Sequence, residues 1–291
     1  MKSCLKTVSI ILALALMLAC GMLFLSSCDK KENSVPRVDY ARINDYAVKT
    51  ETATYQDEMF TAKLYYPENV EAEYGVLFFV GTIIAPEYYD YLGNALAKQG
   101  YVVAIPSAPF AYFEYETKSR PIADAVRDKF ANIKFFVGGH SQGGGAAMRF
   151  ACEEIDSVQG AIFLAPLTFG ARESTEEEYE ALHEAHPEWF NVNNDGSISR
   201  TDTLKNVDLP TLLLEADGDK ILSDADKNNA RAKMPKNVQR HLLAHACHMG
   251  FSTSEMSLAG DGADMSEEDK ENQRFLTASY VLDFLQITVC A

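Results

Sequence analysis

Residues 134–152 read KFFVGGHSQGGGAAMRFAC and join three local patterns. An apolar run at residues 135–137 is typical of a short buried strand, and apolar residues recur at helical spacing over residues 146–151. Between them stands a G-x-S-x-G motif, GHSQG, at residues 139–143. A serine on such a sharp strand-to-helix turn projects its hydroxyl from the carboxyl edge of a sheet, and the glycines let strand and helix pass closely. The stretch therefore predicts Ser141 as a candidate nucleophile.

Strand and helix patterns alternate on both sides of that stretch. An antiparallel strand pair is expected at residues 47–55 and 60–66, joined by a turn at 56–59. Further strands are expected at residues 75–80, 101–105, 160–165, 211–216 and 239–243, and helices at 87–99, 121–132, 223–233 and 266–285. This alternation predicts one α/β domain over residues 46–291 with a mostly parallel, doubly wound sheet.

Residues 172–209 separate two late strands by more chain than a compact fold of this kind needs. The segment STEE at residues 174–177 is a capping box, which predicts a helix to about His186, before Pro187. Insertions that emerge from the carboxyl edge of such a sheet lie over the active site. We therefore expect residues 172–209 to form a small cap there.

The insertion contains a candidate calcium loop. Counting from Asn191, oxygen-bearing residues stand at positions one, three and five, a glycine at six and an acid at twelve. This is the spacing of an EF-hand calcium loop, and it resembles the loops of dockerin-like modules. The candidate ligands of a structural calcium ion are Asn191, Asn193, Asp195, Ser197 and Asp202. An Asn-Asp-Gly turn in a polar loop is the alternative.

The first 28 residues differ in character from the rest. Lys2 and Lys6 precede an almost wholly apolar run at residues 10–25, and the segment LSSC ends at Cys28. It resembles the signal of bacterial lipoproteins, which implies a signal peptide at residues 1–27, lipidation of Cys28 and a tether at 28–45. The protein would then lie in the cell envelope, on the outer side of the cytoplasmic membrane or in the outer membrane. A simple secretory signal and an uncleaved helix are the alternatives.

The net charge limits the classes of binding partner that we expect, and the cysteine content limits the disulfides and metal sites. The net charge of −16 argues against nucleic acid and against binding to anionic lipid through basic patches. Membrane contact is therefore expected only through the lipid anchor. Beyond Cys28 the chain has three cysteines, Cys152, Cys247 and Cys290, an odd number without a close pair. We expect no disulfide framework and no thiolate metal site, although one bridge from Cys152 or Cys247 to Cys290 stays open.

A nucleophilic serine needs a base to take its proton, and the base needs an acid to fix its tautomer. In enzymes whose serine lies on a strand-turn-helix turn of this kind, the three catalytic residues follow one another along the chain in the order serine, acid, histidine. Asp219 lies on the turn after the strand expected at 211–216, and Asp217 is the alternative. His245 and His248 both follow the last expected strand. The pattern predicts a triad but leaves both choices open.

Five stretches resemble the alpha/beta-hydrolase superfamily, and within it the serine-hydrolase branch often called fold-5, close to dienelactone-hydrolase-like and carboxylesterase-like proteins. They read YPENVEAEYGVLFFVGTIIAPEYYDYLGNALAKQGYVVAIPSAPF, GGHSQGGGAAMRFA, PTLLLEADGDKIL, HACHMGF and GDGADMSEEDKENQ. The resemblance implies an alpha/beta-hydrolase fold with Ser141 as nucleophile, Asp219 as acid and His248 as base. Such a triad requires no cofactor for catalysis.

A tetrahedral oxyanion needs two preorganised donors. The backbone N–H of Gln142, at the amino end of the helix after Ser141, is expected to supply one. The loop after the strand at 75–80 is expected to supply the other, from Thr82 or its neighbour Ile83. Several aromatic residues are expected near the mouth of the site, where packing in the core is their expected role. They are Tyr88, Tyr89, Phe110, Tyr112 and Phe113.

These residues together predict hydrolysis of a small-molecule or polymer carboxylic ester through an acyl-enzyme intermediate. A thioester, a lactone, a peptide or an acylated polysaccharide is an alternative substrate, because the pocket and the cap decide between them. An inactive hydrolase scaffold that serves as a binding module is an alternative of another class.

Overall fold

A computed structural model of the chain describes residues 44–55, 60–256 and 258–290. The predicted signal peptide, Cys28 and all but the last two residues of the predicted tether lie outside the described residues, as does the turn at 56–59. Among the helices that are described, none is both long and apolar enough to cross a membrane.

The centre of the fold is an eight-stranded sheet in the order β1-β2-β4-β3-β5-β6-β10-β11. Its strands are β1 (Val48–Tyr55), β2 (Phe60–Pro67), β3 (Tyr74–Phe79), β4 (Val102–Pro106), β5 (Lys134–His140), β6 (Ala161–Leu164), β10 (Thr211–Ala216) and β11 (Gln239–Leu243). Strands β1 and β2 pair antiparallel, and β2 pairs antiparallel with β4. All other pairs are parallel. The predicted strand pair and the mostly parallel sheet are therefore confirmed.

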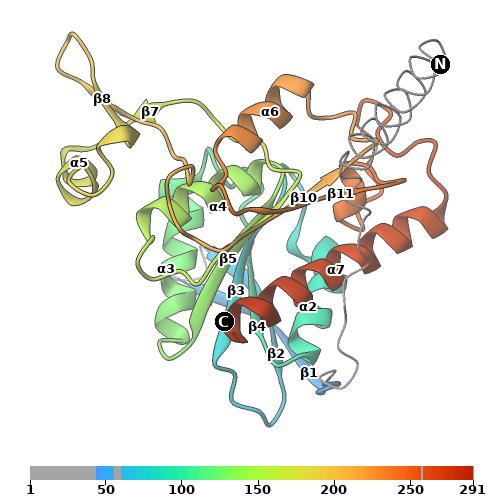
Figure 1. Cartoon of the computed structure of the whole chain (residues 1–291). Coiled ribbons are helices and arrows are strands. Elements are labelled where there is room, and N and C mark those ends of the chain that lie inside the picture. The colour runs from blue at the N-terminus through green and yellow to red at the C-terminus, as the bar shows by residue number, and fades with distance from the viewer. Residues whose placement is uncertain (1–43, 56–59, 257, 291) are drawn as a thin grey trace, which may run out of the picture. The chain divides into compact units, whose positions relative to one another are not determined.

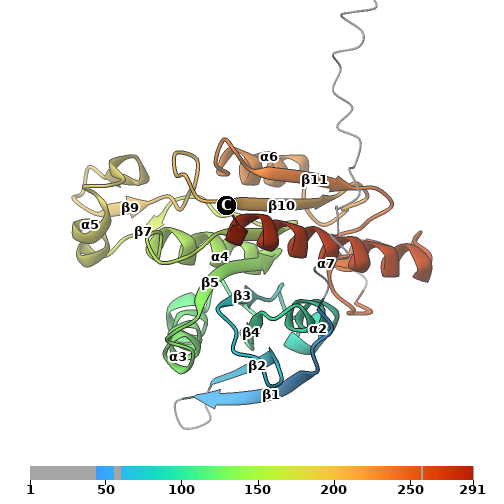
Figure 2. The ribbon, with the colours of Figure 1, turned by 60° about the horizontal axis from the view of Figure 1, so that its bottom comes forward.

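Helices cover both faces of this sheet (Figures 1 and 2). The main ones are α2 (Asp90–Lys98), α3 (Arg120–Lys129), α4 (Gln142–Glu153), α6 (Asp224–Ala232) and α7 (Glu267–Cys290). Because side chains alternate along a strand, Leu77 and Phe79 of β3 pack in a core with α3 and α4. Val76 and Phe78 pack in a second core with α2 and α7. Short helical turns, η2 (Pro86–Tyr89), η3 (Tyr115–Ser119) and η5 (Met249–Phe251), follow β3, β4 and β11.

The insertion between β6 and β10 forms a small separate sheet of order β7-β9-β8. It consists of β7 (Arg172–Glu173), α5 (Glu176–Leu182), η4 (Pro187–Trp189), β8 (Phe190–Val192) and β9 (Ile198–Arg200). A capping box begins α5, but Thr175 and Glu178 make it, one residue later than predicted. Helix α5 also ends earlier than the predicted His186.

The insertion does not cover the carboxyl edge of the main sheet, which differs from the expected cap. The parallel strands point to the right in Figure 1, whereas the insertion projects at the upper left. Trp189 and Leu204 are fully buried in the core that α3 and α4 share. Burial of these two side chains stabilises the position of the insertion beside α4, because their apolar surface is removed from water there.

Candidate active site

Ser141 lies between the end of β5 and the start of α4, at the carboxyl edge of the sheet. Its φ of 54° and ψ of −123° are strained for a residue with a side chain. Three backbone hydrogen bonds hold this conformation. The Ser141 N–H donates to the Leu164 carbonyl at 3.0 Å, and the Ser141 carbonyl accepts from Gly144 at 2.9 Å and from Leu167 at 2.8 Å. The strained turn predicted from the motif is therefore present.

Close backbone packing explains the glycines of the motif. A Cβ atom on Gly139 would lie 2.1 Å from the carbonyl oxygen of Gly143. On Gly143 it would lie 2.2 Å from the carbonyl oxygen of Phe79 in β3. Both distances are far inside van der Waals contact, and the obstructing atoms belong to the backbone. Helix α4 can leave the turn at this angle only because both side chains are absent.

Asp219 and His248 are joined by a buried hydrogen bond of 2.9 Å between Asp219 Oδ2 and His248 Nδ1. The other carboxylate oxygen of Asp219 accepts from the N–H groups of Ile221 and Leu222, both at 2.9 Å. Burial alone would raise the pKa of Asp219, but the hydrogen bonds and the charge of His248 outweigh it and lower that pKa. Asp219 is thus held as a carboxylate that fixes the proton of His248 on Nδ1.

Asp217, the alternative acid, has a different position. Its two carboxylate oxygens accept from the backbone N–H groups of His245 and Ala246, each at 3.1 Å. Asp217 therefore shapes the loop that carries His248 and does not contact the His248 ring. His245 has a left-handed backbone with φ of 51° and is exposed.

His140 connects the loops that carry the site. The N–H of Gly81, after β3, donates to Tyr89 Oη at 3.0 Å, and Tyr89 Oη lies 2.8 Å from His140 Nδ1. His140 Nε2 lies 3.1 Å from the carbonyl oxygen of His248. A carbonyl only accepts, so Nε2 carries the proton and Nδ1 accepts from the tyrosine hydroxyl. Burial lowers the pKa of His140 well below its usual value, which keeps this ring neutral.

In the described structure Ser141 and His248 are linked through His140, the residue that precedes Ser141. Among the described hydrogen bonds none joins the Ser141 hydroxyl to the His248 ring, whereas the rings of His140 and His248 have their centroids 4.8 Å apart. Catalytic hydrogen bonds are often long in enzymes without substrate and shorten in the complex.

Asp261 and Gln273 also hold the histidine loop, and sequence reasoning did not single them out. Asp261 accepts from the N–H groups of Lys220, His248 and Met249, at 2.9, 3.2 and 2.8 Å. It therefore ties the acid loop to the histidine loop. Gln273 of α7 accepts from the Cys247 N–H at 3.0 Å and donates to the Cys247 carbonyl at 2.8 Å. The only sequence signal was their place in the stretch GDGADMSEEDKENQ.

The backbone donors for an oxyanion can be compared directly. Gln142 is the first residue of α4, where an N–H group has no partner within the helix. The Ile83 N–H donates to the Pro109 carbonyl at 2.7 Å and is occupied. No hydrogen bond of the described backbone uses the Thr82 N–H. Gln142 and Thr82 therefore keep the two N–H groups that an oxyanion could use.

Comparison with known proteins supports the same architecture. Residues 75–183 match the model of the alpha/beta hydrolase family. The matched residues run from β3 to α5 and include Ser141. The crystal structure of TT1662 from Thermus thermophilus aligns with a TM-score of 0.55 and 16% identity, covering 84% of this chain and 99% of that one. The crystal structure of a predicted CIB-like hydrolase from Thermoplasma acidophilum aligns with a TM-score of 0.51 and 15% identity. The alignment covers 81% of this chain and 99% of that one. None of the curated proteins matches the sequence.

The fold prediction is thereby confirmed: the chain has the alpha/beta-hydrolase fold, with a small antiparallel insert sheet. At such low identities the two aligned structures show the fold alone. Cys152 and Cys247 are buried free thiols in this fold, so neither forms the bridge to Cys290 that the sequence left open.

Within this hydrolase fold, the candidate calcium loop is a β-hairpin. Asn193 and Ser197 close the turn between β8 and β9, with the Asn193 N–H donating to the Ser197 carbonyl at 2.8 Å. Asp195 Oδ1 accepts from the N–H and hydroxyl of Ser197, at 3.0 and 2.7 Å. Asn191 lies in β8. The hairpin contains the Asn-Asp-Gly turn that the sequence left as the alternative, and calcium binding by this loop stays a prediction.

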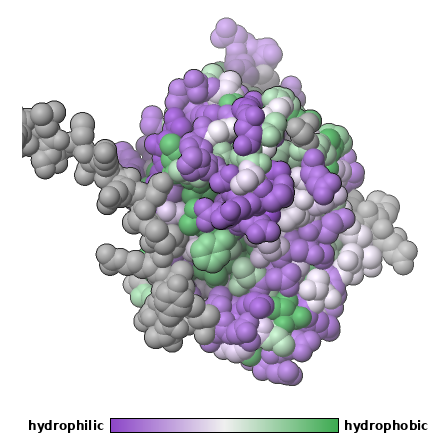
Figure 3. Space-filling model, turned by 90° about the vertical axis from the view of Figure 1, so that its right-hand side faces the viewer, coloured by the Kyte–Doolittle hydropathy of each residue, from purple (hydrophilic) through white to green (hydrophobic). Residues whose placement is uncertain are grey.

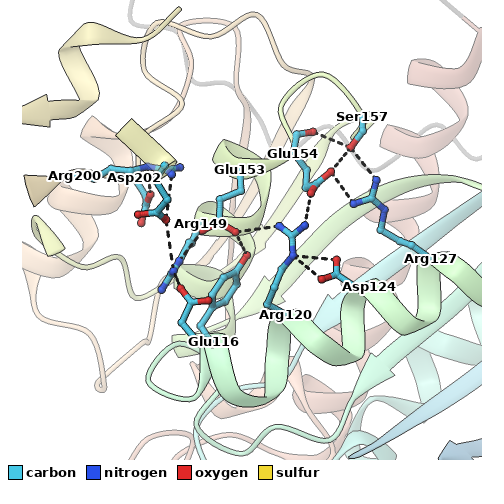
Figure 4. Close-up of polar contacts among 12 residues, drawn as sticks. Glu116, Arg120, Asp124, Arg127, Arg149, Glu153, Glu154, Ser157, Arg200 and Asp202 are labelled. Atoms are coloured by element: carbon cyan, nitrogen blue, oxygen red, sulfur yellow. Dashed lines mark hydrogen bonds and ion pairs between the residues drawn. The ribbon is translucent and has the colours of Figure 1, made fainter. Parts of the chain in front are cut away.

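Asp202, the predicted twelfth position, lies away from that turn in a buried ion network (Figure 4). Asp202 lies 3.0 Å from Arg200 Nε and 3.2 Å from Arg172 Nε. Across the described residues there is no group of three or more His, Cys, Asp or Glu side chains that could hold a metal ion. Uptake of calcium by the five predicted ligands would require Asp202 to leave both arginines.

Arg172 joins the insertion to α4. Its Nη2 lies 2.6 Å from Glu178 Oε1 in α5 and 3.5 Å from Glu153 Oε1 in α4. Burial would raise the pKa of Glu178, but Arg172 outweighs burial and lowers that pKa to about 2. Arg149 of α4 also pairs with Glu153, at 2.8 Å, and with Glu116 (Figure 4). The insertion is thus fastened to the second half of α4, away from Ser141.

Proposed function

We propose that this chain is a serine hydrolase that cleaves carboxylic esters through an acyl-enzyme intermediate. The observation that carries the proposal is the buried 2.9 Å hydrogen bond between Asp219 and His248, on a loop bonded to the residue beside Ser141. The strained turn of Ser141 supports it, because such turns expose a nucleophilic hydroxyl at a sheet edge. The resemblance to the fold-5 serine-hydrolase branch points to the same chemistry.

The proposed reaction begins when Ser141 Oγ attacks the ester carbonyl and His248 Nε2 takes its proton. Asp219 holds the Nδ1 proton of His248 and stabilises the imidazolium that forms. The N–H groups of Gln142 and Thr82 bind the oxyanion, and the amino end of α4 adds its dipole. His248 then gives its proton to the leaving alcohol. Water repeats the sequence on the acyl-enzyme, so this route needs no metal or organic cofactor.

We further propose that the protein is anchored in the cell envelope through a lipid on Cys28. The support is the apolar run at residues 10–25 that ends in LSSC. Incorporation of a labelled fatty acid into the wild-type chain, and its loss in Cys28→Ala, would test this. Labelling of the variant at the wild-type level would overturn it.

Hydrolysis of short activated esters by the purified full-length protein tests the catalytic proposal. We expect turnover by the wild-type protein and at least about a thousandfold less by Ser141→Ala. Equal rates in both proteins would overturn it. A fluorophosphonate probe gives a second readout, because it labels only an activated serine. A protein that neither turns over esters nor takes the label would be an inactive scaffold that binds and does not cleave.

A further inference from the structure

An aromatic contact crosses the carboxyl edge of the sheet. Tyr112 follows β4 and Phe169 follows β6, and these strands are separated in the sheet by β3 and β5. Neighbouring strands lie about 4.8 Å apart, so the two strands are about 14 Å apart. Yet the rings of Tyr112 and Phe169 stack with centroids 3.8 Å apart and planes at 17°. The loop after β4 therefore reaches across the end of the strand that carries Ser141.

Both ends of this contact are tied to the candidate active site. Leu167, two residues before Phe169, donates its N–H to the Ser141 carbonyl. The Phe169 ring lies over Gly145 in the first turn of α4, where an added Cβ would meet it at 2.7 Å. At the other end, the Pro109 carbonyl binds the N–H of Ile83, the neighbour of Thr82. The contact thus spans from the nucleophile turn to the oxyanion loop.

Large apolar side chains on this span are open to solvent. Phe113 packs edge-on against Phe169, with centroids 5.4 Å apart, and is 70% exposed. Phe110 is 41% exposed, and Ile83 is 48% exposed. We call Phe110, Tyr112, Phe113 and Phe169 the aromatic bridge. Figure 3 shows the right-hand side of the molecule in Figure 1, where hydrophobic residues gather in a hollow bordered by hydrophilic ones; it does not label the residues of the bridge.

The aromatic bridge and His248 approach Ser141 from opposite faces of the sheet. The loop of the bridge packs through Ala108 and Ala111 into the core of α3 and α4. Met249 and Phe251, which follow His248, pack into the core of α2 and α7. A base that later protonates the leaving alcohol must lie beside that alcohol. The acyl group of the substrate therefore lies on the other side, against the bridge.

We propose that the aromatic bridge is the acyl-binding subsite and that the substrate carries an apolar acyl chain of several carbons. This inference rests on the proposed ester hydrolysis by Ser141. Exposed aromatic surface next to a reaction centre gains free energy when an apolar chain covers it. An eight-carbon acyl chain offers the bridge several more apolar carbons to cover than a two-carbon acyl group does.

The test compares p-nitrophenyl acetate with p-nitrophenyl octanoate, using the full-length protein and its Phe113→Ser and Phe110→Ser variants. Phe275→Ser is the matched control, because Phe275 is 65% exposed on α7, outside the site. We expect Phe113→Ser to lower kcat/KM for the octanoate by about tenfold and to change that for the acetate by less than about twofold. We expect the control to change neither.

The outcomes separate this inference from the proposed function. One outcome would overturn the acyl subsite alone. In it, the wild-type protein hydrolyses the acetate and takes the fluorophosphonate label, but Phe113→Ser leaves the ratio of kcat/KM for octanoate to that for acetate unchanged. An equal loss in Phe275→Ser would also overturn it, because the effect would then be general to exposed aromatic residues. A wild-type protein inactive on both esters and unlabelled would overturn the proposed function and the subsite with it.

Discussion

His140 donates a hydrogen bond from Nε2 to the carbonyl oxygen of His248, over 3.1 Å. The residue before the candidate nucleophile thereby holds the backbone of the candidate base. On its other side His140 accepts from Tyr89, which in turn accepts from Gly81 near the oxyanion loop. One buried ring thus joins the three loops that must keep a fixed geometry for acyl transfer. We interpret His140 as a positioning residue.

Variants that keep one of the two hydrogen bonds of His140 test this role. A glutamine amide can reach the position of Nε2, whereas an asparagine amide reaches only that of Nδ1. We expect His140→Asn to lower kcat for an activated ester by about tenfold to a hundredfold, because misplacing a catalytic group by about 1 Å costs about that much. His140→Gln should stay within about fivefold of wild type, with KM unchanged in both. Equal losses in the two variants would show a general packing defect instead.

The two aspartates of the acid loop should separate chemistry from stability. Asp219→Asn leaves His248 without the carboxylate that fixes its tautomer, so we expect kcat to fall by about ten-thousandfold with little change in thermal midpoint. Asp217 binds only backbone N–H groups of the histidine loop. Asp217→Asn should therefore cost about 1 kcal/mol of stability and less than about tenfold in kcat. The reverse pattern of losses would make Asp217 the acid.

Backbone contact at Gly143 gives a prediction about stability. A Cβ there would lie 2.2 Å from the Phe79 carbonyl oxygen, so strand and helix would have to separate. We expect Gly143→Ala to lower the free energy of unfolding by about 3 kcal/mol in urea denaturation. Gly170→Ala is the control, since an added Cβ at Gly170 meets nothing within 4 Å. A Gly143→Ala protein as stable as the control would contradict the turn as described.

The sequence predicted the parallel strands and the nucleophile turn because both depend on local patterns. Apolar runs such as residues 75–80 mark buried strands, and the spacing of glycines around Ser141 marks the turn. The position of the insertion could not be predicted in this way. It depends on where Trp189 finds apolar surface, which is on distant α4. The contacts of Asp261 with Lys220 and His248 are equally non-local, so no spacing in the sequence indicates them.

Asp202 should contribute stability through its arginines and not through calcium. Removal of its charge leaves Arg172 and the fully buried Arg200 poorly compensated, so we expect Asp202→Asn to lose about 3 kcal/mol of unfolding free energy. Asp195→Asn, in the exposed turn, should lose less than about 1 kcal/mol. Millimolar calcium should leave the thermal midpoint of wild type unchanged. A calcium-dependent rise that Asp195→Asn abolishes would restore the predicted calcium loop.

Burial of His140 also predicts a pH dependence of stability. In the unfolded chain this ring takes up a proton below about pH 6.5, but in the folded protein burial, with the nearby His248, lowers its pKa well below that value. The unfolded state then binds one more proton, so stability falls as the pH falls below 6.5. The contribution approaches about 1.4 kcal/mol per pH unit once the pH is well below 6.5, where the unfolded ring is fully protonated. Other ionisable groups are common to wild type and His140→Gln, so the difference between their urea stabilities isolates this proton. We expect wild type to lose about 1 kcal/mol more than His140→Gln between pH 6.5 and 5.5. Parallel curves for the two proteins would mean that His140 accepts a proton in the folded state, and its hydrogen bond from Tyr89 could not then exist as described.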